Sequence, residues 1–279
     1  MRLRVPGAPV FSILDRSLLS FLAFETCLYD NGNAAGRVQV FERADRLELR
    51  FGNSIVQSAK SRKAPDLLLL EYTRALLAGM LFVPDDASIL HIGLGAGTIP
   101  DFIHRHFPKA RQRVVEVDRD VIAVAQRFFD LPRSARLEIV QDDGIHYLEI
   151  ARDLFDLIVF DAFHADGAAP QLTTRTAFQL AHKRLKPGGW LVNNAWGSDT
   201  GLLHSITIAL KELFSEVHLL SVRMHSNVIL IAGTPASPTR LGALRERAAV
   251  LSARMPLDFQ PWLRQLALGA ENWPALVSK

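Results

Sequence analysis

The spacing of apolar residues changes along this chain from a period of two to a helical period. Between residues 37 and 58 apolar and charged positions alternate, with turn-forming residues at 43–45 and 52–53. The alternating apolar positions are Val38, Val40, Leu47, Leu49 and Phe51. A period of two is typical of half-buried strands, so this stretch predicts a small antiparallel β unit. From Pro65 the spacing predicts a helix that ends before Pro84.

Beyond residue 88, apolar runs of strand length alternate with helical patterns. The pattern predicts strands at 88–93, 112–117, 136–140, 155–161 and 189–195, and helices at 97–107, 119–130, 144–152, 173–185 and 200–213. Such alternation with short connections indicates a parallel sheet covered by helices on both faces. Two further strands, at 216–222 and 227–232, are joined too closely for a parallel crossover, so we expect them to pair antiparallel.

This order of elements predicts an α/β protein with a Rossmann-like methyltransferase fold, in which a mostly parallel seven-stranded sheet has an antiparallel last strand. We expect three parts. Residues 1–66 would form a small N-terminal β domain, residues 67–235 the Rossmann-like nucleoside-binding catalytic domain, and residues 236–279 a C-terminal helical tail that contains Trp262 and Trp273.

Composition narrows the classes of protein that this chain can belong to. The 279 residues are 49% hydrophobic, which is enough to bury a core without disulfides. The single cysteine, Cys27, excludes an internal disulfide and fits a reducing compartment, so we expect a cytoplasmic protein. A net charge of +3 is too small to indicate nucleic acid. The apolar segments are too short to span a membrane, and no metal-ligand spacing occurs, so we expect neither a membrane partner nor a metal.

A glycine turn follows the first strand of the expected parallel sheet. Gly93, Gly95 and Gly97 form a G-x-G-x-G pattern between that strand and a helix, and Glu116 ends the next strand about 20 residues later. Such glycines let the backbone approach a ligand, and the carboxylate can bind two ribose hydroxyls. The pattern therefore predicts a nucleoside site, with a spacing that suits adenosyl-sulfonium cofactors better than dinucleotides.

Further polar residues stand where the other parallel strands end, which is where ligands bind in open α/β sheets. Asp143 and Gly144 follow the third strand, where the carboxylate could accept from an adenine amino group or cap the next helix. Asp161 ends the fourth strand opposite the glycine turn and could deprotonate an attacking amine. Asn194 ends the fifth strand, where its side chain would face the substrate or simply form a turn.

These motifs, with the small β unit in front of them, resemble the spermidine synthase (polyamine aminopropyltransferase) family from about Val38 to Ala232. The segment from Ile55 to Ser58 and the tract from Asp161 to Phe178 have spacings that match this family in particular. The resemblance implies a transferase that moves an aminopropyl group from decarboxylated S-adenosylmethionine (AdoMet) to a small-molecule amine. We also expect a homodimer.

The resemblance also implies roles for individual residues. Gln57 would contact the nucleoside, Glu116 the ribose and Asp143 the adenine. Asp161 would be the catalytic acid or base on the attacking amine, and Tyr72 would lie beside the acceptor.

Three positions depart from the family pattern. Ala96 replaces the aspartate that binds the amine of the aminopropyl group, and His164 replaces a second aspartate that holds the diamine. Asn194 stands where a glutamine is expected. Because a buried cation needs carboxylates in place of its hydration shell, losing two of them should weaken diamine binding by several kcal/mol, which argues against putrescine as the acceptor.

Two other functions stay open. The chain could be an AdoMet-dependent methyltransferase of a small molecule, because Ala96 removes a carboxylate that would repel the methionine carboxylate and His164 could act as a base. It could also be a nucleoside-binding homologue without catalysis.

Overall fold

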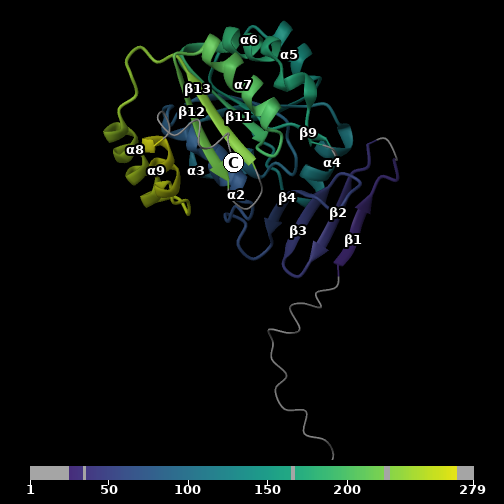
Figure 1. Ribbon diagram of the computed structural model, residues 1–279. Coiled ribbons are helices and arrows are strands. Elements are labelled where there is room, and N and C mark those ends of the chain that lie inside the picture. Colours follow the sequence, from purple (N-terminus) through teal and green to yellow (C-terminus); the bar gives the residue numbers. More distant parts are fainter. Residues whose placement is uncertain (1–24, 34–35, 165–166, 223–226, 269–279) are drawn as a thin grey trace, which may run out of the picture.

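Two separate sheets form the framework of the protein. The computed structural model describes residues 25–33, 36–164, 167–222 and 227–268 (Figure 1). The smaller sheet has four antiparallel strands in sequence order: β1 (Glu25–Asp30), β2 (Gln39–Arg43), β3 (Arg46–Arg50) and β4 (Val56–Ser61). Its alternating apolar side chains Val38, Val40, Leu47 and Leu49 are buried, as the period of two predicts.

The larger sheet has seven strands in the order β12-β13-β11-β8-β5-β6-β7. These are β12 (Glu216–Val222), β13 (Asn227–Gly233), β11 (Leu185–Trp196), β8 (Phe155–Phe160), β5 (Ser88–Ile92), β6 (Arg111–Glu116) and β7 (Leu137–Gln141). Strand β13 pairs antiparallel with both neighbours, and the other pairs are parallel. The predicted fold class is therefore confirmed. The chain order reverses between β5 and β8, which is where such sheets bind ligands.

Helices cover both faces of the larger sheet (Figure 1). One face packs against α3 (Thr98–His106), α8 (Leu241–Arg254), α9 (Gln260–Leu268) and the 3₁₀ turn η1 (Leu77–Leu81), through buried strand residues such as Leu157 and Val159. The other face packs against α5 (Gly144–Ile150), α6 (Arg175–Arg184) and α7 (Thr200–Leu213), through Ile158 and Phe160. Among the described residues, no helix has the length and apolar character needed to cross a membrane.

Helix α4 (Arg119–Phe128) joins the two sheets through one shared core. Val121 and Val124 of α4 pack in the same cluster as Val40 and Leu49 of the smaller sheet, and Val114 of β6 belongs to it too. The smaller sheet therefore closes over the carboxyl ends of β5 and β6.

The structure differs from the sequence prediction at several elements. The helix expected from Pro65 begins only at Glu71, as α2 (Glu71–Leu76), and tightens into η1. Strand β1, the short hairpin β9 (Phe163–His164) and β10 (Gly167–Ala168), and the turn η2 (Pro170–Thr173) were not predicted, whereas α8 and α9 lie within the C-terminal segment that was expected to be helical. Trp262 lies in α9, whereas Trp273 is outside the described residues.

Candidate active site

The glycine turn lies at the carboxyl end of β5, pressed against β4 and the end of β8. Gly93 has φ +100°, and a Cβ atom there would lie 2.3 Å from the carbonyl oxygen of Asp161. Gly95 has φ +54°, and its Cβ would lie 2.7 Å from Ser58 Oγ. Both positions combine a left-handed backbone with no room for a side chain, so only glycine fits them. Gly97, at φ +72°, is the residue before α3.

Strand β4 holds this turn by a side-chain contact. Ser58 Oγ accepts a hydrogen bond from the backbone N–H of Ala96 at 3.2 Å, and both residues are buried. The Ala96 methyl is 1% exposed and packs in the cluster that joins the smaller sheet to α4. The contact therefore holds the glycine turn against the smaller sheet.

Glu116 connects the end of β6 to the glycine turn. Its Oε2 accepts from Leu94 N–H and its Oε1 accepts from Asp118 N–H, each at 2.9 Å. Burial raises the pKa of Glu116 above its ordinary value, and these two backbone donors oppose that rise. The carboxylate is thus held in one orientation, and each oxygen keeps a lone pair with which it can accept a further hydrogen bond.

Asp143 caps α5 and also faces the site. Its Oδ1 accepts from the backbone N–H groups of Ile145 at 2.9 Å and His146 at 3.0 Å. These bonds use one oxygen, so the other can accept from a ligand, and the two roles that the sequence left open are compatible. A Cβ on Gly144 would lie 2.4 Å from Ile92 Cγ2, which shows how closely α5 approaches β5.

Asp161 follows β8 at the point where the strand order reverses. Its backbone N–H donates to Ile92 O at 2.9 Å, and its Oδ1 accepts from Asn194 Nδ2 at 2.8 Å. Burial raises the pKa of Asp161 to about 6, although the Asn194 hydrogen bond lowers it in part. Near neutral pH this carboxyl group is ionised and can accept a proton.

The contact between Asp161 and Asn194 continues to a third residue. Asn194 Oδ1 accepts from Asn227 Nδ2 at 2.9 Å, and both asparagine side chains are buried. Asn194 lies near the end of β11, and Asn227 begins the neighbouring strand β13, where it pairs with Trp196. The two asparagines therefore fix the orientation of the Asp161 carboxylate.

Tyr72 of α2 and Gln57 of β4 line the same cavity as Asp161. The Tyr72 hydroxyl donates to Gln57 O at 2.7 Å. Burial and the nearby Asp161 carboxylate both raise the pKa of Tyr72 well above its ordinary value, so the phenol stays neutral. His164 pairs through its backbone with Gly167 in the β9–β10 hairpin, and its side chain lies outside what the structure describes.

A cavity of about 590 Å³ brings these residues together. Its walls include Gly93, Gly95, Gln57, Tyr72, Glu116, Asp143, Gly144 and Asp161. The described lining also contains the carboxylates of Asp118 and Asp142, while Arg37 is its one arginine or lysine. Burial lowers the pKa of the lining residue His91 to about 4, so this imidazole is neutral. The cavity therefore carries an excess of negative charge and favours a cationic ligand.

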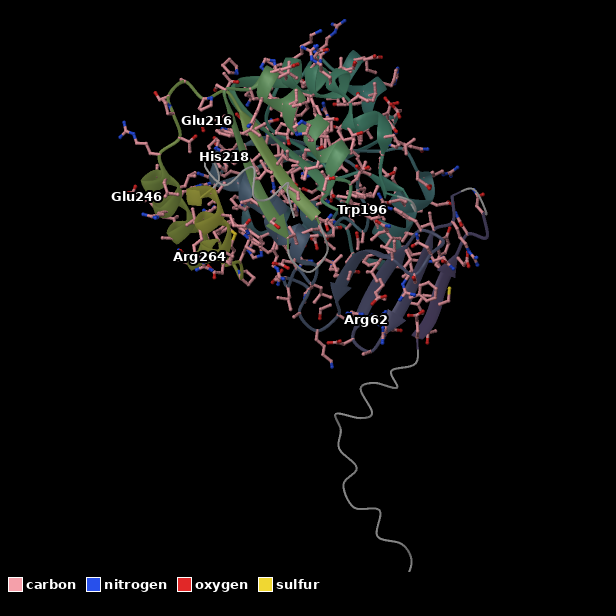
Figure 2. The ribbon with its side chains drawn as sticks, in the orientation of Figure 1. Arg62, Trp196, Glu216, His218, Glu246 and Arg264 are labelled. Carbon is pink, nitrogen blue, oxygen red and sulfur yellow. The ribbon has the colours of Figure 1, made fainter. Side chains whose placement is uncertain are left out.

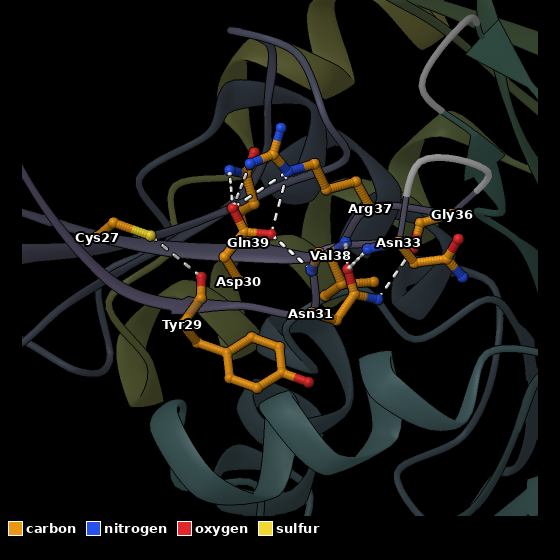
Figure 3. A network of polar contacts seen from close by, with 10 residues as sticks. Cys27, Tyr29, Asp30, Asn31, Asn33, Gly36, Arg37, Val38 and Gln39 are labelled. Carbon is orange, nitrogen blue, oxygen red and sulfur yellow. Dashed lines mark hydrogen bonds and ion pairs between the residues drawn. The ribbon is translucent and has the colours of Figure 1, made fainter.

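Arg37 is already engaged at the rim of this cavity. Its guanidinium donates to both carboxylate oxygens of Asp30, with Nε at 3.0 and 3.1 Å (Figure 3). The same carboxylate accepts from Gln39 Nε2 at 2.9 Å and from the backbone N–H of Gly32, also at 2.9 Å. The positive charge of Arg37 is therefore largely compensated by Asp30.

A second cavity of about 100 Å³ adjoins the first, and both have Gln57, Tyr72 and Phe163 in their walls. Its remaining lining consists of Ile55, Val56, Leu70, Asn194, Trp196 and Asn227. Trp196, the last residue of β11, lies at the edge of the larger sheet that faces the smaller one (Figure 2). The ring of Phe163 lies 6.2 Å from that of Trp196, centroid to centroid.

Sequence reasoning placed most of the residues of this site but missed three. Ser58, Asn227 and Trp196 all stood in segments that the pattern had identified, yet no motif gave them a role. Their importance depends on partners far away in the chain, such as Ala96 for Ser58 and Asn194 for Asn227.

Comparisons with known proteins agree with this geometry. Residues 72–229 match the family model "Spermine/spermidine synthase domain". A polyamine aminopropyltransferase of Chromobacterium violaceum is 34% identical over 235 residues, which are 84% of this chain and 90% of that protein. A probable spermidine synthase from Corynebacterium glutamicum has a similar structure, with a TM-score of 0.67 at 24% identity over 88% of this chain and 94% of that one.

Human Methyltransferase-like protein 13, solved in complex with SAH, is also similar. Its TM-score is 0.61 at 27% identity, covering 66% of this chain and 91% of that chain.

Proposed function

Since the chain belongs to the spermine/spermidine synthase family, we propose that it transfers an aminopropyl group from decarboxylated AdoMet to the nitrogen of a small-molecule amine. One observation carries the proposal. The Asp161 carboxylate lies in the large acidic cavity and is hydrogen-bonded to Asn194, which lines the adjoining small cavity. It therefore stands between a site of suitable size for the donor and a second site for an acceptor.

The donor would occupy the large cavity. Glu116 would accept hydrogen bonds from the ribose hydroxyls, Asp143 from the adenine amino group, and Gln57 would contact the nucleoside. The glycine turn would lie against the adenosine because Gly93 and Gly95 have no side chains. The sulfonium and the propylamine are both cationic, and the excess of carboxylates in the described lining supports their binding.

The charge of the cavity also bears on the choice of donor. The carboxylate of intact AdoMet would gain from a cation, and in the described lining the only arginine or lysine is Arg37, which is paired with Asp30. This arrangement favours the decarboxylated donor.

Asp161 would act as the base. An acceptor amine arrives as an ammonium, and the Asp161 carboxylate takes one of its protons. The freed nitrogen lone pair attacks the propyl carbon bound to the sulfonium, forming a C–N bond while the electrons of the broken C–S bond return to sulfur. The products are methylthioadenosine, a neutral thioether, and a secondary ammonium, and Asp161 then passes the proton that it took to solvent. Asn194 and Tyr72 would position the base and the acceptor.

A direct experiment tests this proposal. The protein is incubated with decarboxylated AdoMet and a panel of amines, and methylthioadenosine is quantified. We expect amine-dependent release, and we expect Asp161→Asn to lose about 10²–10⁴-fold in turnover while methylthioadenosine affinity changes little. Unchanged turnover in this variant would show that Asp161 is not the base.

Methyl transfer from AdoMet is a second candidate, favoured by Ala96, because the glycine turn carries no carboxylate to hold the propylamine at that position. The same assay distinguishes it, since a methyltransferase would form S-adenosylhomocysteine and a methylated acceptor.

We also propose that the protein is a homodimer, that it is cytoplasmic and that its reaction needs no metal, as expected from the sequence. Light scattering after size-exclusion chromatography and assays with a chelator test the first and the last.

A further inference from the structure

The described walls of the small cavity beside Asp161 contain no carboxylate that could hold a second cation. Five of its described lining side chains are apolar: Ile55, Val56, Leu70, Phe163 and Trp196. The other four are Gln57, Tyr72, Asn194 and Asn227, so none of the described side chains in this lining is charged.

The polar groups of this cavity are largely occupied by one another. Asn194 donates to Asp161 and accepts from Asn227, and the Tyr72 hydroxyl donates to Gln57 O. A ligand entering here would therefore meet apolar and aromatic surface first. The distal ammonium of a diamine would lose water without gaining a carboxylate from the described lining, which is costly.

We propose that the acceptor is a primary monoamine with a short apolar tail, whose nitrogen lies at Asp161 and whose tail fills the small cavity against Trp196 and Phe163. This inference rests on the proposed aminopropyl transfer and names its substrate class. The carboxylate of Asp161 serves the attacking nitrogen, and the tail requires no second charge. The reaction is the one written above, with the monoamine as the nucleophile.

Amines of matched length test the inference. With saturating decarboxylated AdoMet, methylthioadenosine release is measured for n-butylamine against 1,4-diaminobutane and for n-pentylamine against 1,5-diaminopentane. We expect kcat/KM for each monoamine to exceed that of the matching diamine by at least tenfold. A preference of the wild-type protein for diamines would overturn the inference and leave aminopropyl transfer intact. Absence of methylthioadenosine with every amine would overturn aminopropyl transfer, and this inference with it.

Leu70 offers a matched pair of variants. It lines the small cavity and is the N-cap residue of α2, where it makes no side-chain cap hydrogen bond. Both aspartate and asparagine are favourable N-caps, so each substitution should be tolerated by the helix, and only one adds a charge. We expect Leu70→Asp to shift the monoamine-to-diamine ratio of kcat/KM toward diamines by at least tenfold, and Leu70→Asn to shift it far less.

Equal shifts in the two variants would assign the effect to the cap or to lost packing, and would overturn the role of charge in the selectivity.

Trp196→Ala supplies a separate measurement. We expect it to reduce kcat/KM for n-pentylamine by at least fivefold while methylthioadenosine affinity is retained. An unchanged kcat/KM for n-pentylamine in this variant would show that the tail does not bind in the small cavity.

Discussion

At the scale of single residues, Glu116 holds the glycine turn and also lines the proposed donor site. Two backbone N–H groups, on Leu94 and Asp118, donate to its carboxylate. A glutamine can accept only through its one oxygen, so Glu116→Gln leaves one of these donors facing an N–H₂ group. We expect the variant to weaken methylthioadenosine binding about tenfold or more, the scale of charged hydrogen bonds at about 1.5–3 kcal/mol. Isothermal calorimetry measures it.

Asp118→Asn is the matched control for this prediction. Asp118 also lines the cavity, and its Oδ1 caps α4 by accepting from Asp120 N–H at 2.7 Å, which an asparagine can still do. We expect a much smaller loss of affinity. Equal losses in both variants would mean that the overall charge of the cavity, and not a ribose contact of Glu116, determines binding.

Asp161 gives a prediction about pH and activity. Because its pKa is raised to about 6 in the ligand-free protein, kcat/KM for the donor should rise as pH increases through about 6. The sulfonium of the bound donor favours the carboxylate, so the corresponding limb in kcat should lie at lower pH. A pH–rate series from about 5 to about 9 measures both limbs, and superimposable limbs would contradict a donor charge placed near Asp161.

The same group predicts an effect on stability. A carboxyl group whose pKa is raised by folding contributes stability below its unfolded pKa of about 3.9, and this contribution is lost as pH rises through about 6. An asparagine in place of Asp161 would keep the hydrogen bond from Asn194 without the buried charge. We therefore expect Asp161→Asn to have the higher melting temperature at about pH 8, with a difference that shrinks toward about pH 4. A lower melting temperature of the variant at the alkaline end would show that other contacts of the carboxylate outweigh its burial.

At the scale of elements, the contact between β4 and the glycine turn holds one wall of the proposed donor site. Ser58→Ala removes the acceptor of the Ala96 N–H, at a cost of about 1 kcal/mol. We expect donor affinity to fall about three- to tenfold. Ser61→Ala is the control on the same strand, because Ser61 Oγ accepts from Ala64 N–H away from the turn. Equal donor affinities in the two variants would show that the Ser58–Ala96 hydrogen bond does not determine donor binding.

The elements also show what a sequence pattern can and cannot predict. Glu116 and Asp161 could be placed because each follows a buried apolar strand, and the topology of a parallel sheet brings such strand ends together. Strand β1 was missed because its residues Glu25–Asp30 are largely exposed and polar, and its pairing with β2 carries a bulge. The helix predicted from Pro65 begins only at Glu71. Residues 62–67 are exposed, and the spacing of apolar residues in the sequence does not indicate which of them become buried.

Close packing explains a further difference. A Cβ on Gly79 would lie 2.6 Å from Val192 Cγ2, so η1 lies directly against β11. No local pattern indicates that such a distant strand approaches residue 79. The small cavity has the same character, because Leu70, Trp196 and Asn227 meet there from three separate parts of the chain.

At the scale of the whole molecule, a buried ion pair adds to the core that joins the two sheets. Lys60 Nζ of β4 lies 3.0 Å from Asp101 Oδ2 of α3 and also donates to Phe129 O, which follows α4. The side chains of both charged residues are 7% exposed. Together with the shared apolar cluster, this contact makes independent unfolding of the smaller sheet unfavourable. We therefore expect residues 1–66, proposed as a separate domain, to unfold together with the larger sheet.

Removing each partner of this pair should have unequal effects. Asp101→Ala leaves the Lys60 ammonium buried without a carboxylate, at a cost of about 3–5 kcal/mol. Lys60→Met keeps most of the side-chain volume, and Asp101 retains Arg105, whose Nε and Nη2 donate to it at 2.9 and 2.8 Å. We expect Lys60→Met to lose clearly less stability than Asp101→Ala in urea unfolding. The reverse order would mean that the hydrogen bond to Phe129 O matters more than the buried charge.

The shared core also predicts that both sheets unfold in one transition. Cys27 is the only cysteine of the chain and is exposed on β1, so a fluorophore attached to it reports on the smaller sheet. Trp190 and Trp196 of β11 and Trp262 of α9 report on the rest by intrinsic fluorescence. We expect the two probes to give coincident urea curves in the wild-type protein, because the apolar cluster and the Lys60–Asp101 pair both span the boundary. If the Cys27 probe changes first, residues 1–66 form a domain with its own stability, and the donor site then loses its β4 wall before the larger sheet unfolds.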